Sequence, residues 1–331
     1  FRPQAGATCD LAGTRYRVQS HPDAPRVAHR VEGRQSAVYR LQGAEGEMWA
    51  LKVFSPRFRQ QRLAQQAEAI AGLAELPGLQ ACRRRVLTPE ADAALLQAEP
   101  DLTYAVLMPW ISGPTWAQVM QARRPLAPET ALHLAHALAL TLVSMEQRDV
   151  AHCDLCGSHL LLPALRNGAS TAAGDIVALV DLEDIFAPDL RRPETLSVGS
   201  PGYAHRSASS GLWNPLGDRF AGAVLLAEIL GCCDEAVCRA AWGNSYFEPG
   251  ELQAAGARYS LLYGVLRSRI GSAAATLFGR AWKVDALAEC PTFGEWLVAL
   301  PAPTGPIVLP AEPPAPEPAR PAEEVPAPIG E

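Results

Sequence analysis

The stretch "VAHCDLCGSHLLL", residues 150–162, decides how the rest of the chain is interpreted. It places one aspartate, Asp154, among two histidines and two cysteines, between a long apolar segment and a run of leucines. A carboxylate at the end of an apolar stretch is costly to bury without a compensating partner, so we interpret Asp154 as a site residue. Two interpretations of the stretch follow: a zinc knuckle, or a loop that presents one functional carboxylate.

The zinc interpretation rests on four residue types that zinc prefers, His152, Cys153, Cys156 and His159. The gaps between the paired residues are only two residues long, and no second C-x-x-C motif stands elsewhere to complete a site. The spacing therefore favours the carboxylate loop, with zinc as the alternative.

Three further charged residues complete a recognisable set. Lys52 lies in the strand-like stretch "ALKVF" (50–54), Glu68 in the helix-like segment that follows, and Asp181 in "LVDLED" (179–184). Phosphoryl transfer uses a lysine to hold phosphates, a glutamate to orient that lysine, a carboxylate to take the hydroxyl proton, and a carboxylate to hold Mg²⁺. The sequence therefore indicates a phosphate-handling site built from Lys52, Glu68, Asp154 and Asp181.

Hydrophobic periodicity divides the chain near residue 110. Alternating apolar and polar residues predict strands over 36–41, 47–54 and 103–110, with one helix over 58–78 between them. Apolar stripes predict helices over 128–149, 218–231, 260–282 and 292–300, and a short strand pair surrounds a loop at 166–174. The expected fold class is α+β, with a small antiparallel sheet carrying one helix, followed by a larger helical part.

In this order the segments resemble the protein-kinase fold, over about residues 30–300. "HCDLCGSHLLL" is similar to the catalytic loop, "VDLED" to the metal-binding segment, and "YAVLMPWISG" to the hinge. "GSPGYAHR" (199–206) looks like the end of the activation segment, and "GDRFAGAVLLAEIL" like the buried helix anchored by Asp218. The resemblance implies a bilobal molecule, with an N-lobe and hinge over 30–110 and a C-lobe over 111–300.

The resemblance also implies ATP with Mg²⁺ or Mn²⁺ as cofactors. It assigns catalytic roles to Asp154, Lys52 and Glu68 and metal binding to Asp181 and His159. The residues it places around the nucleotide are Gly33, Ala50, Lys52, Met108 and Trp110.

Several positions depart from the kinase pattern. In the stretch "VEGRQSAV" (31–38), only Gly33 remains of three expected glycines, which compromises close backbone approach to phosphate. His159 stands where an asparagine would hold the second metal ion, and Glu183 replaces a glycine beside Asp181. These changes favour a pseudokinase that acts as a nucleotide-sensing signalling scaffold, or a weakly active kinase. Lys52 and Asp154 favour the alternative, an active divergent Ser/Thr protein kinase.

Composition limits which partners and which cellular compartment are expected. The 331 residues are 48% hydrophobic and 19% charged, with a net charge of -6, which argues against a nucleic-acid partner. No apolar run reaches the length of a membrane span, and eight scattered cysteines fit a reducing cytoplasm. Residues 1–29 are expected to form an N-terminal extension and the Pro/Ala/Glu-rich residues 301–331 a linker that tethers another module. A protein substrate or signalling partner is expected.

Overall fold

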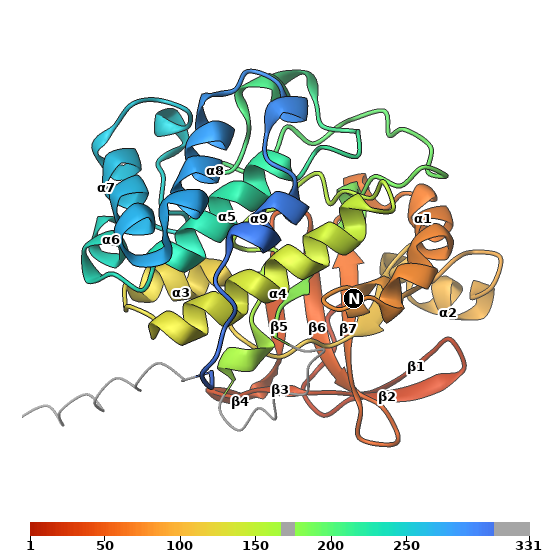
Figure 1. Cartoon of the computed structure of the whole chain (residues 1–331). Coiled ribbons are helices and arrows are strands. Elements are labelled where there is room, and N and C mark those ends of the chain that lie inside the picture. The colour runs from red at the N-terminus through yellow and green to blue at the C-terminus, as the bar shows by residue number, and fades with distance from the viewer. Residues whose placement is uncertain (167–175, 308–331) are drawn as a thin grey trace, which may run out of the picture.

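The computed structural model describes residues 1–166 and 176–307, and shows an α+β molecule with a curled antiparallel sheet. The strand order of the main sheet is β1-β2-β6-β7-β9-β8, and β5 pairs with β6 on the same sheet. Helices α5–α9 gather at the upper left in Figure 1, and the β1–β2 ribbon extends at the lower right. The strands of the main sheet are β1 (Thr8–Leu11), β2 (Thr14–Val18), β5 (Arg30–Glu32), β6 (Ser36–Gln42), β7 (Met48–Phe54), β8 (Arg85–Val86) and β9 (Val106–Pro109).

The alternation of residues along β7 sets the direction of its side chains. Leu51 and Val53 lie in one hydrophobic cluster, while Ala50 and Phe54 lie in another, because successive side chains of a strand point to opposite faces. Lys52 shares the face of Ala50 and Phe54, and its register partners are Val38 on β6 and Val106 on β9. The sequence pattern thus directs a lysine onto a largely apolar sheet face.

The predicted strands over 36–41 and 47–54 are confirmed as β6 and β7, whereas the stretch 103–110 forms the shorter β9. Residues 1–29 are not a separate extension: β2 pairs with β6 through Arg17 opposite Gln42, and β1 pairs with β2. A second small ribbon, β3 (Ser20–His21) with β4 (Ala24–Ala28), lies between β2 and β5 in the chain.

The predicted helices are present with altered bounds. The helix expected over 58–78 is α1 (Arg62–Ile70), which continues as a 3-10 turn over Ala71–Glu75. The helix expected over 260–282 is interrupted by a π turn and by Gly271, whose φ of 135° lies outside the helical region. The helices after α1 are α2 (Ala93–Ala98), α3 (Trp116–Ala122), α4 (Pro128–Glu146), α5 (Arg219–Gly231), α6 (Glu235–Ala240), α7 (Ala257–Val265), α8 (Ser272–Lys283) and α9 (Phe293–Ala299).

The largest hydrophobic cluster is built around α4 and α5. Every residue from Phe220 to Gly231 on α5 is buried, which agrees with a segment that is apolar on all sides. The cluster also includes Ile70, Leu79 and Cys82, which precede the sequence boundary near residue 110. The chain therefore passes from the sheet to the helical core and back before β9, so part of the segment expected to form the N-lobe packs with residues expected to form the C-lobe.

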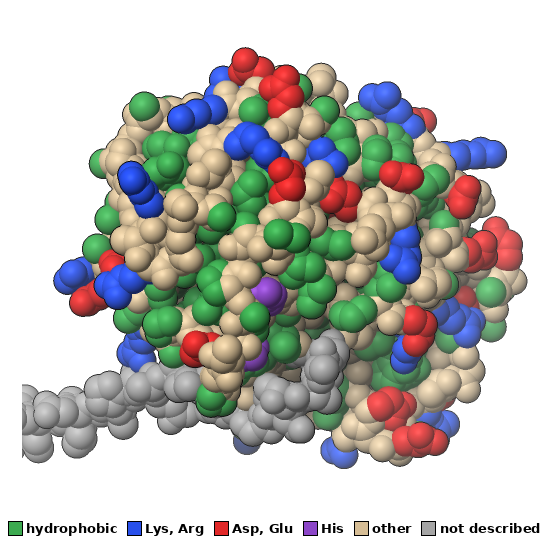
Figure 2. Space-filling view, in the orientation of Figure 1, with side chains coloured by type: hydrophobic (Ala, Val, Ile, Leu, Met, Phe, Trp, Pro, Cys, Tyr) green, Lys and Arg blue, Asp and Glu red, His purple; other side chains and the backbone are tan. Residues whose placement is uncertain are grey.

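The strand pair expected around 166–174 is β10 (Leu160–Leu161) with β11 (Ala178–Leu179). Most of the loop between them, and most of the linker expected over 301–331, lie outside the described residues. Among the helices that the structure describes, none has the length and apolar character needed to cross a membrane. Acidic and basic side chains are interspersed over the face shown in Figure 2.

Candidate functional site

A cavity of about 2030 Å³ lies along the sheet face that carries Lys52. Its walls come from the β5–β6 turn, β7 and the end of β9 on the sheet side, and from the loops around residues 154–159, 181–184 and 191–200 on the other. It is the cavity in which the residues singled out from the sequence meet: Gly33, Ala50, Lys52, Met108, Trp110, Asp154, His159 and Asp181 all line it.

Lys52 is held by two carboxylates from one short loop. Its Nζ donates to Asp181 Oδ1 at 2.6 Å and to Glu183 Oε2 at 2.7 Å, and the side chain is 5% exposed. Burial alone would lower the pKa of Lys52, but the Glu183 and Asp181 carboxylates more than offset this and raise the pKa above its usual value. The lysine is therefore a fixed cation at the floor of the cavity.

Glu183 is the centre of this ion network. Its second oxygen, Oε1, accepts from Arg84 Nη1 at 3.2 Å, and the Arg84 side chain is almost fully buried. Burial raises the pKa of Glu183 and the neighbouring Asp181 adds to the effect, while Lys52 and Arg84 oppose it. Its backbone carbonyl accepts from Gln66 and Arg62 of α1, which fixes the loop against that helix.

Glu68 does not meet Lys52. It is exposed on α1, whereas the buried polar residue on the inner face of that helix is Gln66, which donates to the Leu182 and Glu183 carbonyls at 2.9 and 3.1 Å. The expected pairing was wrong because the shorter helix presents positions 63, 66, 67 and 70 inward. Glu183 was noted in the sequence as a departure beside Asp181, but nothing in the spacing indicated that it would take the glutamate's place.

Asp154 and His159 lie next to each other on the loop after α4. Asp154 Oδ1 accepts from Ser200 Oγ at 2.9 Å, and its side chain is 21% exposed. His159 Nδ1 lies 2.8 Å from the Asp154 carbonyl oxygen, and its Nε2 lies 3.4 Å from Asp181 Oδ2. Burial would lower the pKa of His159, but Cys156, Asp181 and Asp154 raise it to about 10.

Buried Asp218, at the start of α5, anchors this loop. Its two oxygens accept from the backbone N–H groups of His152 and Cys153 at 2.6 and 2.9 Å. Cys153 has φ 62°, a left-handed conformation that costs energy in a non-glycine residue, and the Asp218 contact holds it there. Asp181 has φ 61° as well, so both site loops adopt conformations that the surrounding contacts must maintain.

The residues proposed as metal ligands do not assemble into a metal site. Both oxygens of Asp181 face protein cations, Lys52 on one side and His159 on the other. Within residues 1–166 and 176–307, no group of three His, Cys, Asp or Glu side chains is placed to hold a metal ion. The zinc alternative also fails, since His152 faces the Val180 carbonyl and Cys153 the Asn214 carbonyl.

The sheet side of the cavity is mainly apolar. Ala50 and Met108 are register partners on β7 and β9, and both are buried. Trp110 follows β9, donates its backbone N–H to the Met48 carbonyl, and packs against the Arg40 guanidinium. An apolar wall with a few fixed polar groups is typical of small-molecule sites.

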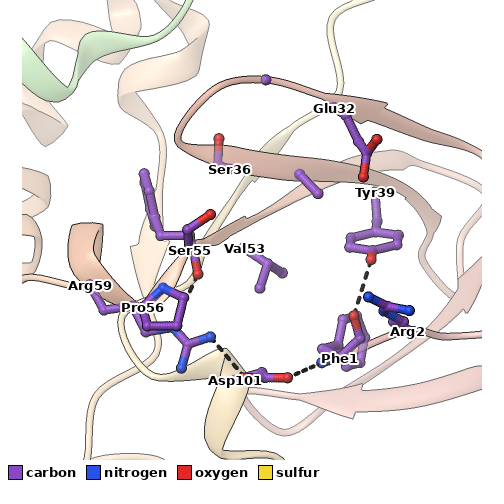
Figure 3. Close-up of a pocket in the computed structure, with 13 residues that line it drawn as sticks. Phe1, Arg2, Glu32, Ser36, Tyr39, Val53, Ser55, Pro56, Arg59 and Asp101 are labelled. Carbon is purple, nitrogen blue, oxygen red and sulfur yellow. Dashed lines mark hydrogen bonds and ion pairs between the residues drawn. The ribbon is translucent and has the colours of Figure 1, made fainter.

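A smaller cavity of about 290 Å³ lies on the other side of the β5–β6 turn (Figure 3). Asp101 binds Arg59 and the Phe1 amino group there, and Tyr39 donates to the Phe1 carbonyl. These polar groups are paired with one another, which distinguishes this cavity from the larger one.

Compared with protein-family models and with curated proteins, the chain matches none.

Proposed function

We propose that the chain is a protein-kinase-like domain that binds ATP in the large cavity. The observation that carries the proposal is the convergence of Lys52, Asp181 and Asp154 on one cavity from strand and loops that are far apart in sequence. A buried lysine held by carboxylates beneath an apolar wall is an arrangement suited to a nucleotide, with the base against Ala50, Met108 and Trp110.

The same geometry favours a signalling scaffold, or a weakly active kinase, over an efficient phosphotransferase. Asp154 lies at the cavity with Ser200 as its hydrogen-bond partner, where a carboxylate could accept a hydroxyl proton. However, Asp181 and His159 are engaged with each other, so they are poorly arranged to hold a metal ion on a transferring phosphate. The alternative, an active divergent Ser/Thr protein kinase, retains support from Lys52 and Asp154.

The cellular setting is proposed from the sequence. We expect a cytoplasmic protein of net charge -6 that acts on another protein or is recruited by one. The Pro-rich residues after 301 would serve as a tether to a further module. No nucleic-acid partner is proposed.

The test is the affinity for ATP of the Lys52→Ala variant, measured by isothermal titration calorimetry. The chain offers a matched control, because its only other lysine is Lys283, which is exposed on α8. We expect Lys52→Ala to weaken ATP binding by about 100-fold or more, since a charge-assisted contact to phosphate is lost, and Lys283→Ala to bind normally. Equal affinities in the two variants would remove Lys52 from the site.

Phosphoryl transfer is tested separately, by incubation with γ-labelled ATP and a mixture of protein substrates. Label transfer that disappears in Asp154→Asn would favour the active-kinase alternative. ATP binding without transfer would favour the scaffold.

A further inference from the structure

Two of the carboxylates that line the cavity, Asp181 and Glu183, are already paired with basic side chains of the protein. Asp181 contacts Lys52 through Oδ1 and His159 through Oδ2. Glu183 contacts Lys52 through Oε2 and Arg84 through Oε1. The four oxygens of these two carboxylates therefore all face a basic side chain, and none of them can bind a divalent ion without breaking one of these contacts. Asp154 and Asp184 also line the cavity, but within the described residues they belong to no group of three side chains placed to hold a metal ion.

His159 occupies the second oxygen of Asp181. Its Nδ1 faces the Asp154 carbonyl oxygen, which only accepts hydrogen bonds, so this nitrogen carries a proton and fixes the orientation of the ring. Its Nε2 lies 3.4 Å from Asp181 Oδ2. A divalent ion on Asp181 would be repelled by the Lys52 ammonium group and would have to displace the His159 ring from Oδ2.

The mouth of the same cavity is positively charged. Arg34, Arg57, Arg191 and Arg192 line it, are exposed, and form no ion pair with an acidic side chain of the described residues. Of the two exposed acids on this rim, Glu32 is paired with Arg30, and Glu194 stands alone. A rim with this excess of arginine is unexpected on a chain of net charge -6.

From these contacts we infer that the cavity takes a nucleotide polyphosphate as the free anion, without a divalent cation. The inference rests on the proposed function and specifies the form of the ligand. Arginine suits this role, since its guanidinium binds phosphate oxygens through two parallel hydrogen bonds. The rim arginines thus supply the positive charge that a metal ion supplies when nucleotides bind as metal complexes.

The experiment is isothermal titration calorimetry of the full chain with ATP, once in EDTA and once in excess MgCl₂. We expect binding in EDTA to be at least as tight as binding in MgCl₂, since Mg²⁺ reduces the charge of ATP that the arginines recognise. Binding that is about tenfold tighter with Mg²⁺ would overturn the inference and leave the proposed function in place. Absence of binding under both conditions would overturn the inference and the proposed function together.

The rim is tested with the double variant R191Q/R192Q against the matched control R239Q/R267Q. The control removes the same charge from exposed positions on α6 and the π turn after α7, which do not line the cavity. In EDTA we expect the rim variant to bind ATP roughly fivefold or more weakly, and the control to bind as the wild type does. An equal loss in both variants would mean that only net charge matters and would overturn the assignment of the rim.

Discussion

Lys52 receives both of its carboxylate partners from residues 181–183 and none from helix α1. The sequence was sufficient to predict that Lys52, Asp154 and Asp181 lie at one cavity, because each is a charged residue next to an apolar stretch and the cost of burial demands a partner. It was insufficient to show that Glu68 is not a partner of Lys52, since the rotation of α1, which turns Gln66 inward and leaves Glu68 exposed, is set by tertiary packing.

Replacement of Glu183 by glutamine should destabilise the protein. Arg84 and Lys52 are both buried, and loss of the shared carboxylate leaves one without an ionic partner and the other with only Asp181. Breaking a buried pair on one side costs about 3 kcal/mol or more of the free energy of unfolding. Glu68→Gln, at an exposed position of α1, should change it by less than about 0.5 kcal/mol. Urea denaturation of both variants provides the comparison, and equal midpoints would contradict this assignment.

Replacement of His159 by asparagine should create a preference for the metal complex of ATP. The change removes the imidazole ring from Asp181 Oδ2 and introduces a neutral amide oxygen, which is a ligand that Mg²⁺ accepts. Titrations of ATP with and without MgCl₂ should then favour the magnesium form in His159→Asn alone. His136→Asn on α4, which contacts the Pro301 carbonyl, serves as the control. If MgCl₂ changes the ATP affinity of His159→Asn no more than that of the wild type, the His159 ring does not determine whether the metal complex is preferred.

At the scale of elements, α5 carries a carboxylate in the middle of the helical core. Glu228 is fully buried and accepts from Trp116 Nε1 on α3, from Tyr203 OH and from the backbone N–H of Tyr246, at 2.8 to 2.9 Å. Burial raises the pKa of Glu228 from 4.5 to about 7, although the three hydrogen bonds oppose this. One acidic side chain therefore connects α3, α5 and the segment around Tyr203.

The raised pKa gives the stability of the protein a definite pH dependence. A carboxyl with a higher pKa in the folded state stabilises the fold below pH 4.5 and loses this contribution as the pH rises through about 7. The Glu228→Gln variant lacks this titration. We expect the free energy of unfolding of the wild type, relative to Glu228→Gln, to fall by roughly 2 to 3 kcal/mol between pH 4.5 and pH 7.5. Chemical denaturation at several pH values measures it, and parallel pH profiles would contradict it.

The elements were predictable where apolar residues recur regularly along a segment or fill it throughout. The strands β6 and β7 and the helices α4, α5 and α9 follow the expected stretches closely. Short helices were less predictable, because six or seven residues carry little periodicity: α9 was expected, whereas α2, α3 and α6 were not. The interruption between α7 and α8 was missed, since the apolar residues before Arg267 and after Ser272 were taken as one helix that continues across Gly271.

At the scale of the whole molecule, the sheet and the helical core are joined by more than the chain after β9. The segment from Ile70 to Cys82 packs into the helical core. Within it, the Gly78 carbonyl accepts from the Leu179 N–H at 2.8 Å, and the Pro77 carbonyl accepts from Thr141 Oγ1 at 3.2 Å. Leu179 lies on β11, two residues before Asp181. The contacts of Pro77 and Gly78 with Thr141 and Leu179, here called the 77–78 contact, therefore also fix the loop that holds Lys52. Such long-range contacts leave no pattern in the sequence beyond the Pro77-Gly78 pair.

The 77–78 contact is tested by substitution of Gly78. Gly78 has φ +80°, and a Cβ there would lie 2.6 Å from Thr141 Oγ1 and 3.3 Å from the Val177 carbonyl oxygen. We expect Gly78→Ala to lower the free energy of unfolding by about 1 to 3 kcal/mol, from backbone strain and crowding together. Gly72→Ala is the matched control, because a Cβ at Gly72 meets open space, and it should be neutral or stabilising by up to about 1 kcal/mol.

The same pair of variants separates stability from the geometry of the site. If the 77–78 contact positions the loop of Asp181 and Glu183, the Gly78→Ala variant should also bind ATP more weakly under conditions where it is fully folded. The Gly72→Ala variant should bind ATP as the wild type does. A Gly78→Ala protein that loses stability but keeps full ATP affinity would show that the contact with α4 and β11 supports the core alone. The position of Lys52 relative to its carboxylates would then depend on the ion network itself, with Arg84 as its buried anchor.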